Sequence, residues 1–177
     1  MRTMVTVLLL AGSAAAQQIQ LKLEHLAAKA EEAVDVKLDG STLQLASRFL
    51  SGKSADEARV KKLIEGLQGI YVKAFEFEKP GAYTQADVEA VRSQLRSPEW
   101  SRIVGVRSRK DGENAEVFLH GAADRVTGLV ILATEPTEFT VVNIVGPIDL
   151  EALSELGGQF SIPAVQLDRS KDGKKGK

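Results

Sequence analysis

The stretch GLVILATEPTEFTVVNIVG, residues 128–146, decides the fold of this chain. Residues 128–133 are apolar without alternation, which is typical of an interior strand that is covered on both faces. The motif EPTE at residues 135–138 favours a turn, and the β-branched residues within 139–145 favour a second strand. The stretch therefore predicts an antiparallel strand pair inside a sheet.

Two more strands precede this pair. Residues 100–109 and 114–120 flank Asp111-Gly112, the residue pair preferred in two-residue type I′ hairpins. A turn of that type predicts four facing pairs: Lys110 with Glu113, Arg107 with Glu116, Val106 with Val117, and Val104 with Leu119. One face of the hairpin is then apolar, and the other pairs opposite charges.

The remaining elements follow from periodicity and turn signals. Residues 70–77 (IYVKAFEF) are expected to form a strand that ends at Lys79-Pro80-Gly81, and a short strand is expected at 34–38. Helices are expected at residues 23–34, 41–50, 54–67, 84–96 and 149–156, with N-caps at Ser54, Thr84 and Asp149. Together these elements predict an α+β domain with an antiparallel sheet of four to six strands, packed against several amphipathic helices.

Residues 1–16 have the features of a secretory signal peptide. Arg2 is followed by the apolar run MVTVLLL and by small residues that end with Ala14-Ala15-Ala16. This order predicts cleavage between Ala16 and Gln17, and an uncleaved N-terminal helix is the alternative. The apolar run is shorter than the about 20 helical residues that cross a bilayer, and no later transmembrane segment is expected. Because no cysteine is present for lipid attachment, the protein is expected to be exported and soluble, in the periplasm or secreted.

The composition excludes several classes of function. The 177 residues include 23 Lys and Arg, 24 Asp and Glu, two His and no Cys. Without cysteine there can be no disulfide, thiolate metal site, iron-sulfur cluster or cysteine nucleophile. Residues 168–177 (DRSKDGKKGK) carry five basic and two acidic side chains and are predicted to be a disordered basic tail. A tail that contacts an anionic envelope surface or RNA is the alternative.

These segments divide the chain into a signal peptide at 1–16, a single α+β domain at 17–167 and the tail at 168–177. Without Arg2 and the tail, 17 of the 23 basic and 22 of the 24 acidic residues remain, so the domain has a formal charge of −5. A charge of that sign does not favour nucleic-acid binding, and no nucleic-acid partner is expected.

The sequence contains no catalytic or metal-binding motif. Neither His25 nor His120 belongs to such a motif, and phosphate-binding glycine loops and nucleophile elbows are absent. On the predicted hairpin register His120 faces Ile103 and is expected to be exposed. No catalytic residue, metal or cofactor is therefore predicted.

A candidate surface patch consists of Trp100, Arg102, Arg107 and Arg109. Basic side chains beside an aromatic platform could bind an anion. Glu113 and Glu116 on the facing strand are expected to neutralise part of this charge, which favours a structural role.

Four stretches resemble the domain of unknown function 4252 family: residues 69–78 (GIYVKAFEFE), 83–96, 100–113 (WSRIVGVRSRKDGE) and 140–160 (TVVNIVGPIDLEALSELGGQF). The resemblance extends over residues 23–163. It implies an exported bacterial envelope protein with a link to envelope stress or regulation, and it implies no catalytic residues. Many relatives carry a lipid-attachment cysteine after the signal, which this chain lacks, so the resemblance implies no membrane anchor here.

Two functions remain open at this point. The first is a non-enzymatic protein that binds another envelope protein, as export and the absence of catalytic motifs suggest. The alternative is a small-ligand-binding or hydrolytic domain whose site is assembled from scattered polar residues. A concave pocket with convergent polar groups would support the alternative.

Overall fold

A computed structural model describes residues 17–122 and 125–149 of the chain. The predicted signal peptide, the helix expected after Asp149 and the basic tail lie outside the described residues.

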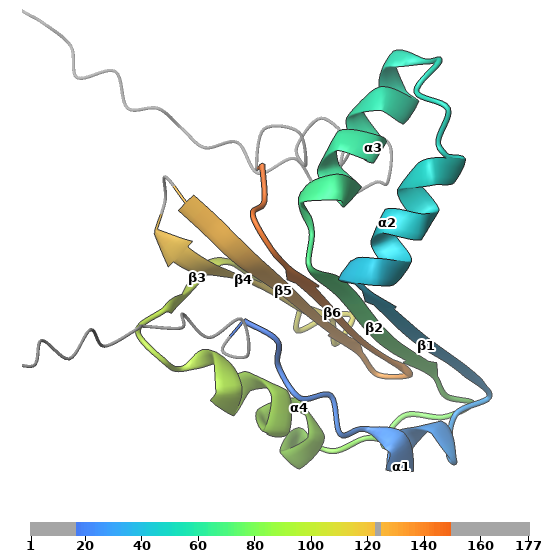
Figure 1. The fold of residues 1–177 in the computed structure, drawn as a ribbon. Coiled ribbons are helices and arrows are strands. Elements are labelled where there is room, and N and C mark those ends of the chain that lie inside the picture. Colours follow the sequence, from blue (N-terminus) through green and yellow to red (C-terminus); the bar gives the residue numbers. More distant parts are fainter. Residues whose placement is uncertain (1–16, 123–124, 150–177) are drawn as a thin grey trace, which may run out of the picture.

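A six-stranded antiparallel sheet forms the centre of the domain (Figure 1). Its strands are β1 (Glu32–Asp39), β2 (Gly69–Glu76), β3 (Trp100–Arg107), β4 (Asn114–Ala122), β5 (Arg125–Glu135) and β6 (Glu138–Val145). They lie in the order β1-β2-β6-β5-β4-β3, so β3 to β6 are hairpin neighbours and β2 pairs with β6. The interior position of β5 confirms the prediction from its unbroken apolar run, and the predicted α+β class is confirmed.

The helices within the described residues are α1 (Glu24–Ala27), α2 (Gly40–Phe49), α3 (Ala55–Gly66), α4 (Gln85–Arg92) and a 3₁₀ turn, η2 (Ser93–Leu95). Asp39 and Ser54 accept hydrogen bonds from the first turns of α2 and α3. The Asp87 carboxylate accepts from the backbone N–H of Thr84 at 2.7 Å. These caps satisfy backbone donors that have no partner inside the helix, and they confirm the helices predicted at 41–50, 54–67 and 84–96.

The helix predicted at residues 23–34 is wrong beyond its first turn. α1 ends at Ala27, and residues 32–39 form β1, which pairs with β2 along its whole length. The segment EAVDVKLD alternates apolar and polar residues from Val34 onward, which is the period of a half-buried strand. Pairing with β2 stabilises the strand, and this outweighs the weaker helical periodicity of the same residues. The short strand expected at 34–38 is confirmed and is longer than predicted.

The register predicted for the β3–β4 hairpin is wrong by two residues. Val104 faces Val117, and Gly105 faces Glu116. The loop spans residues 108–113, because Ser108 N donates to Glu113 O at 2.8 Å and the Ser108 hydroxyl donates to Asp111 at 2.8 Å. These local side-chain and backbone hydrogen bonds stabilise a longer loop than the two-residue turn.

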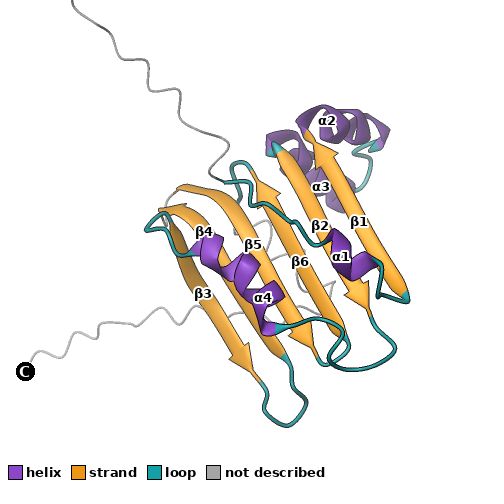
Figure 2. Cartoon of the chain, turned by 90° about the horizontal axis from the view of Figure 1, so that it is seen from below, coloured by secondary structure: helices purple, strands orange, loops and turns teal. Residues whose placement is uncertain are grey.

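Helices cover the two faces of the sheet unequally (Figure 2). α1, α4 and residues 17–23 lie over one face, which we call the closed face. α2 and α3 stand over one end of the other face, which we call the open face. The closed face holds an aromatic group of Phe75, Phe77, Tyr83 and Phe139, with ring centroids 5.3–6.4 Å apart. The main apolar core therefore lies on the closed face.

Candidate functional site

A continuous row of apolar side chains crosses the open face from strand to strand. This central row consists of Val36, Val72, Val142, Ile131, Val117 and Val104, in the order of the strands. All six are only half-buried. On the closed face, by contrast, Val130, Phe139 and Val141 have no exposed surface. Half-exposed β-branched residues in the middle of a sheet are thus confined to one face.

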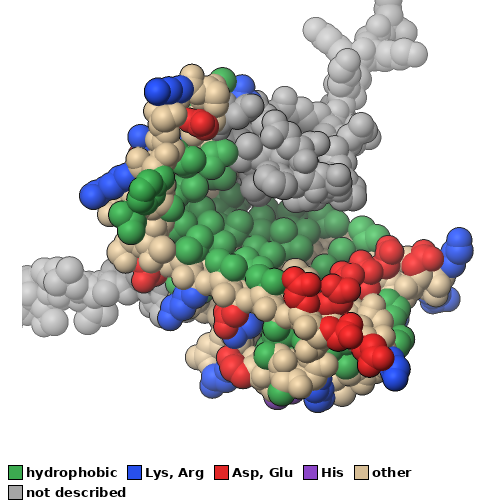
Figure 3. Space-filling view, turned by 90° about the vertical axis from the view of Figure 1, so that its right-hand side faces the viewer, with side chains coloured by type: hydrophobic (Ala, Val, Ile, Leu, Met, Phe, Trp, Pro, Cys, Tyr) green, Lys and Arg blue, Asp and Glu red, His purple; other side chains and the backbone are tan. Residues whose placement is uncertain are grey.

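α2 and α3 cover only one end of the open face. Leu43 and Ile64 cluster there with the adjacent row of the sheet, which contains Leu38, Ile70, Ile144, Leu129 and Leu119. At the uncovered end, Val34 on β1 is 40% exposed and Val106 on β3 is 53% exposed. Figure 3 shows a hollow lined by hydrophobic side chains, bounded on one side by a band of acidic side chains. Contiguous apolar surface of this kind marks interaction sites in globular proteins.

The acidic border of the hollow is a row of glutamates, which we call the glutamate row. Glu32, Glu76, Glu138 and Glu135 lie directly opposite one another on β1, β2, β6 and β5. Burial, and then the negative charges of Glu138 and Glu113, raise the pKa of Glu135. Because like charges on facing strand positions are destabilising, a cationic partner would relieve this repulsion. The open face therefore combines an apolar floor with a border that attracts positive charge.

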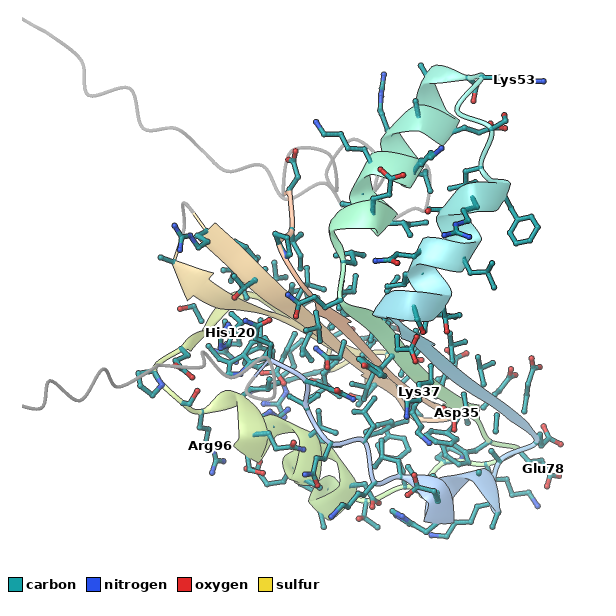
Figure 4. All side chains as sticks on the ribbon, in the orientation of Figure 1. Asp35, Lys37, Lys53, Glu78, Arg96 and His120 are labelled. Carbon is teal, nitrogen blue, oxygen red and sulfur yellow. The ribbon has the colours of Figure 1, made fainter. Side chains whose placement is uncertain are left out.

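A cleft of about 460 Å³ lies on the other side of the sheet, between residues 18–21 and the β1–β2 pair. Its polar lining includes Asp35, Lys37, Tyr71 and Lys73 (Figure 4). Lys73 Nζ lies 2.8 Å from Asp35 Oδ2 and 3.3 Å from Glu24 Oε1. The hydrogen bond with Asp35, partly opposed by burial, raises the pKa of Lys73. An ammonium group that stays protonated cannot serve as a nucleophile or a general base, so Lys73 gives this cleft a cation for binding rather than an activated group.

The buried amide of Asn143 holds the start of the described chain against the closed face. Asn143 Oδ1 accepts a hydrogen bond from Ile19 N at 3.1 Å. Its Nδ2 donates to the carbonyl oxygens of Gln17 and Leu129 at 3.2 and 3.3 Å. No sequence motif marks Asn143; the one available signal is a polar residue at an inward position of the strand at 139–145.

Gln94 in η2 holds the same segment from the α4 side. Gln20 N donates to Gln94 Oε1 at 2.8 Å, and Gln94 Nε2 donates to Gln20 O at 3.0 Å. The predicted cleavage site between Ala16 and Gln17 thus directly precedes an anchored segment, although Ala16 itself lies outside the described residues.

The structure does not gather the candidate patch of the sequence analysis into one surface. Trp100 is 7% exposed and offers no platform on which a ligand could stack. Arg107 and Arg109 are exposed at the opposite end of β3 and in the following loop. Glu116, one of the two glutamates expected to neutralise the patch, pairs with Arg102 of the patch and with Arg92 of α4, as described next.

Glu116 forms an ion-pair bridge between α4 and the edge of the sheet. Its two carboxylate oxygens lie 2.7 Å from Arg92 Nη2 and 2.9 Å from Arg102 Nη1. Burial alone would raise the pKa of Glu116, but hydrogen bonds from both guanidinium groups outweigh it and lower that pKa below its ordinary value. Arg102 therefore has a structural partner on the neighbouring strand, which supports the structural role expected for this part of the patch.

His120 is buried, so the expectation that it is exposed opposite Ile103 is wrong. A β-bulge between Arg102 and Val104 shifts the register and brings His120 opposite Trp100, with ring centroids 5.0 Å apart. Its Nδ1 lies 2.8 Å from Thr127 Oγ1. Figure 4 places His120 well away from Asp35 and Lys37 of the cleft.

His25 lies elsewhere, where its Nε2 is 2.7 Å from Asp87 Oδ1 between α1 and α4. Among the described residues, no group of three or more His, Asp or Glu side chains could hold a metal ion. In this same part of the chain, no helix has the length and apolar character needed to cross a membrane. The described part of the molecule is therefore an α+β domain with one open, acid-bordered sheet face and one cleft beneath an anchored N-terminal segment.

The sequence of this domain matches a known protein family. The family model DUF4252, a domain of unknown function, matches residues 27–156. The match covers most of the chain, so the protein belongs to this family, and the resemblance found in the sequence is confirmed. No curated protein and no solved structure matches the chain significantly.

Proposed function

We propose that this protein is an exported envelope protein that binds another protein through the open face of its sheet and catalyses no reaction. The observation that carries the proposal is the central row of six half-exposed β-branched side chains. Burial of such side chains against a partner is favourable by about 25 cal/mol for each Å² removed from water. Since the apolar side chains at the centre of the closed face are fully buried, the exposure is selective and supports a docking role.

The partner that fits this surface is an amphipathic segment with apolar residues on one side and Lys or Arg residues next to them. Its apolar side would lie on the central row. Its cations would face the glutamate row, where Glu135 already carries the repulsion of its neighbours. The electrostatic match would set the orientation and speed of association more than the affinity.

Export is supported by the signal-like sequence of residues 1–16. The hydrogen bond between Asn143 and the carbonyl oxygen of Gln17 supports cleavage before Gln17, because the cleaved chain would retain its anchored segment. Amino-terminal sequencing of the exported protein tests this point. A mature chain that begins at Gln17 is expected, and one that begins at Met1 would contradict it.

The docking proposal is tested with a fluorescent synthetic peptide that forms an amphipathic helix of Leu and Lys. The full chain is compared with the double variant Val72→Ser, Val142→Ser, which makes the centre of the open face polar. The matched control is Leu45→Ser, because Leu45 is 54% exposed on α2 and lies two helical positions from the buried Leu43. We expect the double variant to lose at least about tenfold in affinity and the control to bind like the parent. Equal binding by all three proteins would contradict the proposal.

The contribution of the glutamate row is measured separately with Glu76→Gln, Glu138→Gln. This variant keeps the apolar floor and removes two of the facing charges. We expect a weaker dependence of peptide affinity on salt, because fewer ion pairs form on binding. A peptide with the same apolar side and Glu in place of Lys should bind more weakly to the parent, and equal binding of the two peptides would exclude a role for the row.

Binding of a small polar molecule is a second candidate function, which the cleft of about 460 Å³ favours. Its size falls within the range of ligand pockets, and the paired Lys73 favours binding over hydrolysis. A thermal-shift screen of small polar compounds tests it, with Lys37→Ala in the cleft lining and Lys62→Ala, exposed on α3, as the control. A stabilising compound whose effect is lost only in Lys37→Ala is expected. Effects that persist in both variants, or no effect at all, would contradict it.

A further inference from the structure

The described chain ends on the open face. After β6, Gly146 N donates to Thr127 O and Ile148 N donates to Val126 O, each at 2.9 Å. The Ile148 side chain is 8% exposed and belongs to the apolar cluster of the open face, together with Leu129 and Leu119. Whatever follows Asp149 therefore starts at the end of the open face that α2 and α3 cover, in the same apolar cluster as Val117 and Ile131 of the central row.

The 28 residues that follow have the composition that we derived for a partner. Leu150, Leu153 and Leu156 recur every three residues, and further apolar residues follow at Phe160 and Ile162. Residues 168–177 carry five basic and two acidic side chains. The order along the chain is thus an apolar part first and a cationic part last.

This order matches the order of features on the open face. The apolar floor lies next to the point where the chain leaves the sheet, and the glutamate row lies at the other end of β6, a strand of eight residues. That strand is roughly 25 Å long, at about 3.3 Å per residue. Even with one short helix at its start, a segment of 28 residues reaches this distance, since extended chain covers up to about 3.3 Å per residue.

We propose that residues 150–177 bind along the open face of their own molecule, with the leucines on the central row and the basic end against the glutamate row. The inference rests on the proposed function, because the segment occupies the same surface as the partner. The segment and the partner then compete. A tethered segment has an effective concentration of about 1 mM, so even modest affinity keeps the surface occupied until a partner displaces it.

The absence of cysteine allows a direct test of this contact in the full chain. The pair Val142→Cys, Leu153→Cys places one thiol on the central row and one in the segment. The control pair Ala90→Cys, Leu153→Cys places the first thiol on the exposed side of α4, over the closed face. At low protein concentration, a short bismaleimide should link the first pair within one molecule at least about tenfold faster than the control pair.

Three cross-linking outcomes decide the inference. Faster intramolecular linkage of the Val142→Cys pair, lost when Leu150 and Leu156 are both replaced by Asp, supports it. Equal rates for the two pairs overturn it. Linkage only between two molecules also overturns it, because the occupant would then be a second copy of the chain.

The peptide assay separates this inference from the proposed function. Leu150→Asp with Leu156→Asp should raise the affinity for the Leu and Lys peptide by about tenfold if the segment blocks about nine-tenths of the molecules. If the peptide binds the parent and this variant equally while cross-linking also fails, the inference is wrong and the docking function stands. If neither protein binds the peptide but cross-linking succeeds, the segment is a permanent part of the core and the docking function is wrong.

Discussion

The closed and open faces of the sheet differ in what covers them rather than in the kind of residue they present. Val141 and Val142 are neighbours on β6, yet Val141 has no exposed surface and Val142 is half-buried. On β5, Leu132 is sealed and Ile131 is not. Apolar composition along a strand therefore does not reveal which face binds to the rest of the molecule and which face is available to something else.

The difference comes from the connections between the strands. The chain between β2 and β3 crosses the closed face and places α4 there, and residues 17–23 fill the space beside it. The connection between β1 and β2 carries α2 and α3, which contact the open face at one end. A long crossover thus seals one face, and a connection that returns to a neighbouring strand leaves most of the other face uncovered.

The largest effect that tests this comparison is expected on β5. Leu132→Ala should cost about 2–5 kcal/mol in the free energy of unfolding, because it leaves a cavity in the closed core. Ile131→Ala, one residue away on the open face, should cost about 1 kcal/mol, since its side chain is already partly in water. Urea unfolding at neutral pH measures both values. Equal costs would show that the open face is sealed as tightly as the closed face.

A somewhat smaller effect is expected at Asn143. Asn143→Val leaves the N–H of Ile19 and the carbonyl of Leu129 without their side-chain partner, and it should cost about 2–3 kcal/mol. The control is Thr140→Val on the open face of the same strand, which should change stability by less than about 0.5 kcal/mol. Hydrogen exchange adds a local readout. The Ile19 amide should exchange faster only in Asn143→Val, and unchanged protection there would contradict the anchoring role.

Glu116 provides a pH-dependent effect on the closed face. Its pKa is lowered in the folded protein, so its contribution is present above the ordinary value of 4.5 and is lost as the pH falls through the folded value. Glu116→Gln should therefore cost about 1–3 kcal/mol at neutral pH, and the difference from the parent should shrink as the pH falls below about 4. Urea unfolding at both pH values measures it, with the exposed Glu65→Gln as control. A cost that is independent of pH would contradict the ion-pair explanation.

The smallest effect is expected at Glu135 on the open face, where stability changes with pH in the opposite direction to that at Glu116. Its pKa is raised in the folded protein, so stability is full below the ordinary value of 4.5 and decreases as the pH rises through the folded value. In the background of Leu150→Asp, Leu156→Asp, which is expected to release the terminal segment from the face, Glu135→Gln removes the repulsion and should raise the thermal midpoint at neutral pH by about 1–3 °C. The gain should vanish at acidic pH. A lower midpoint at neutral pH in this background would contradict the repulsion among the glutamates.

Much of the fold follows from local sequence. The strands at 70–77, 128–133 and 139–145 and the caps at Ser54 and Thr84 were predictable, because side-chain period and capping chemistry act over a few residues. The full extent of the strand at 32–39 was not, because its pairing depends on β2, whose partner residues lie 30 or more positions later in the chain. The same holds for His120, whose burial depends on the covered face of the sheet and whose partner Trp100 depends on a bulge in the facing strand.

The candidate site was hidden from the sequence for the same reason. Glu32, Glu76, Glu138 and Glu135 come from four strands, and only the register of the sheet makes them one row. The central row likewise takes one residue from each of six strands. Neither set has a spacing that a motif search would detect.

The sequence by itself determined the class of the domain, its antiparallel hairpins, most of its helices and its family, because these depend on short-range periods and on recognisable phrases. Only the tertiary structure decided which sheet face is sealed, where the acidic side chains align and which polar groups are paired. Those properties arise from contacts between residues far apart in the chain, and the free energy of such contacts depends on what covers each side chain rather than on its neighbours in sequence.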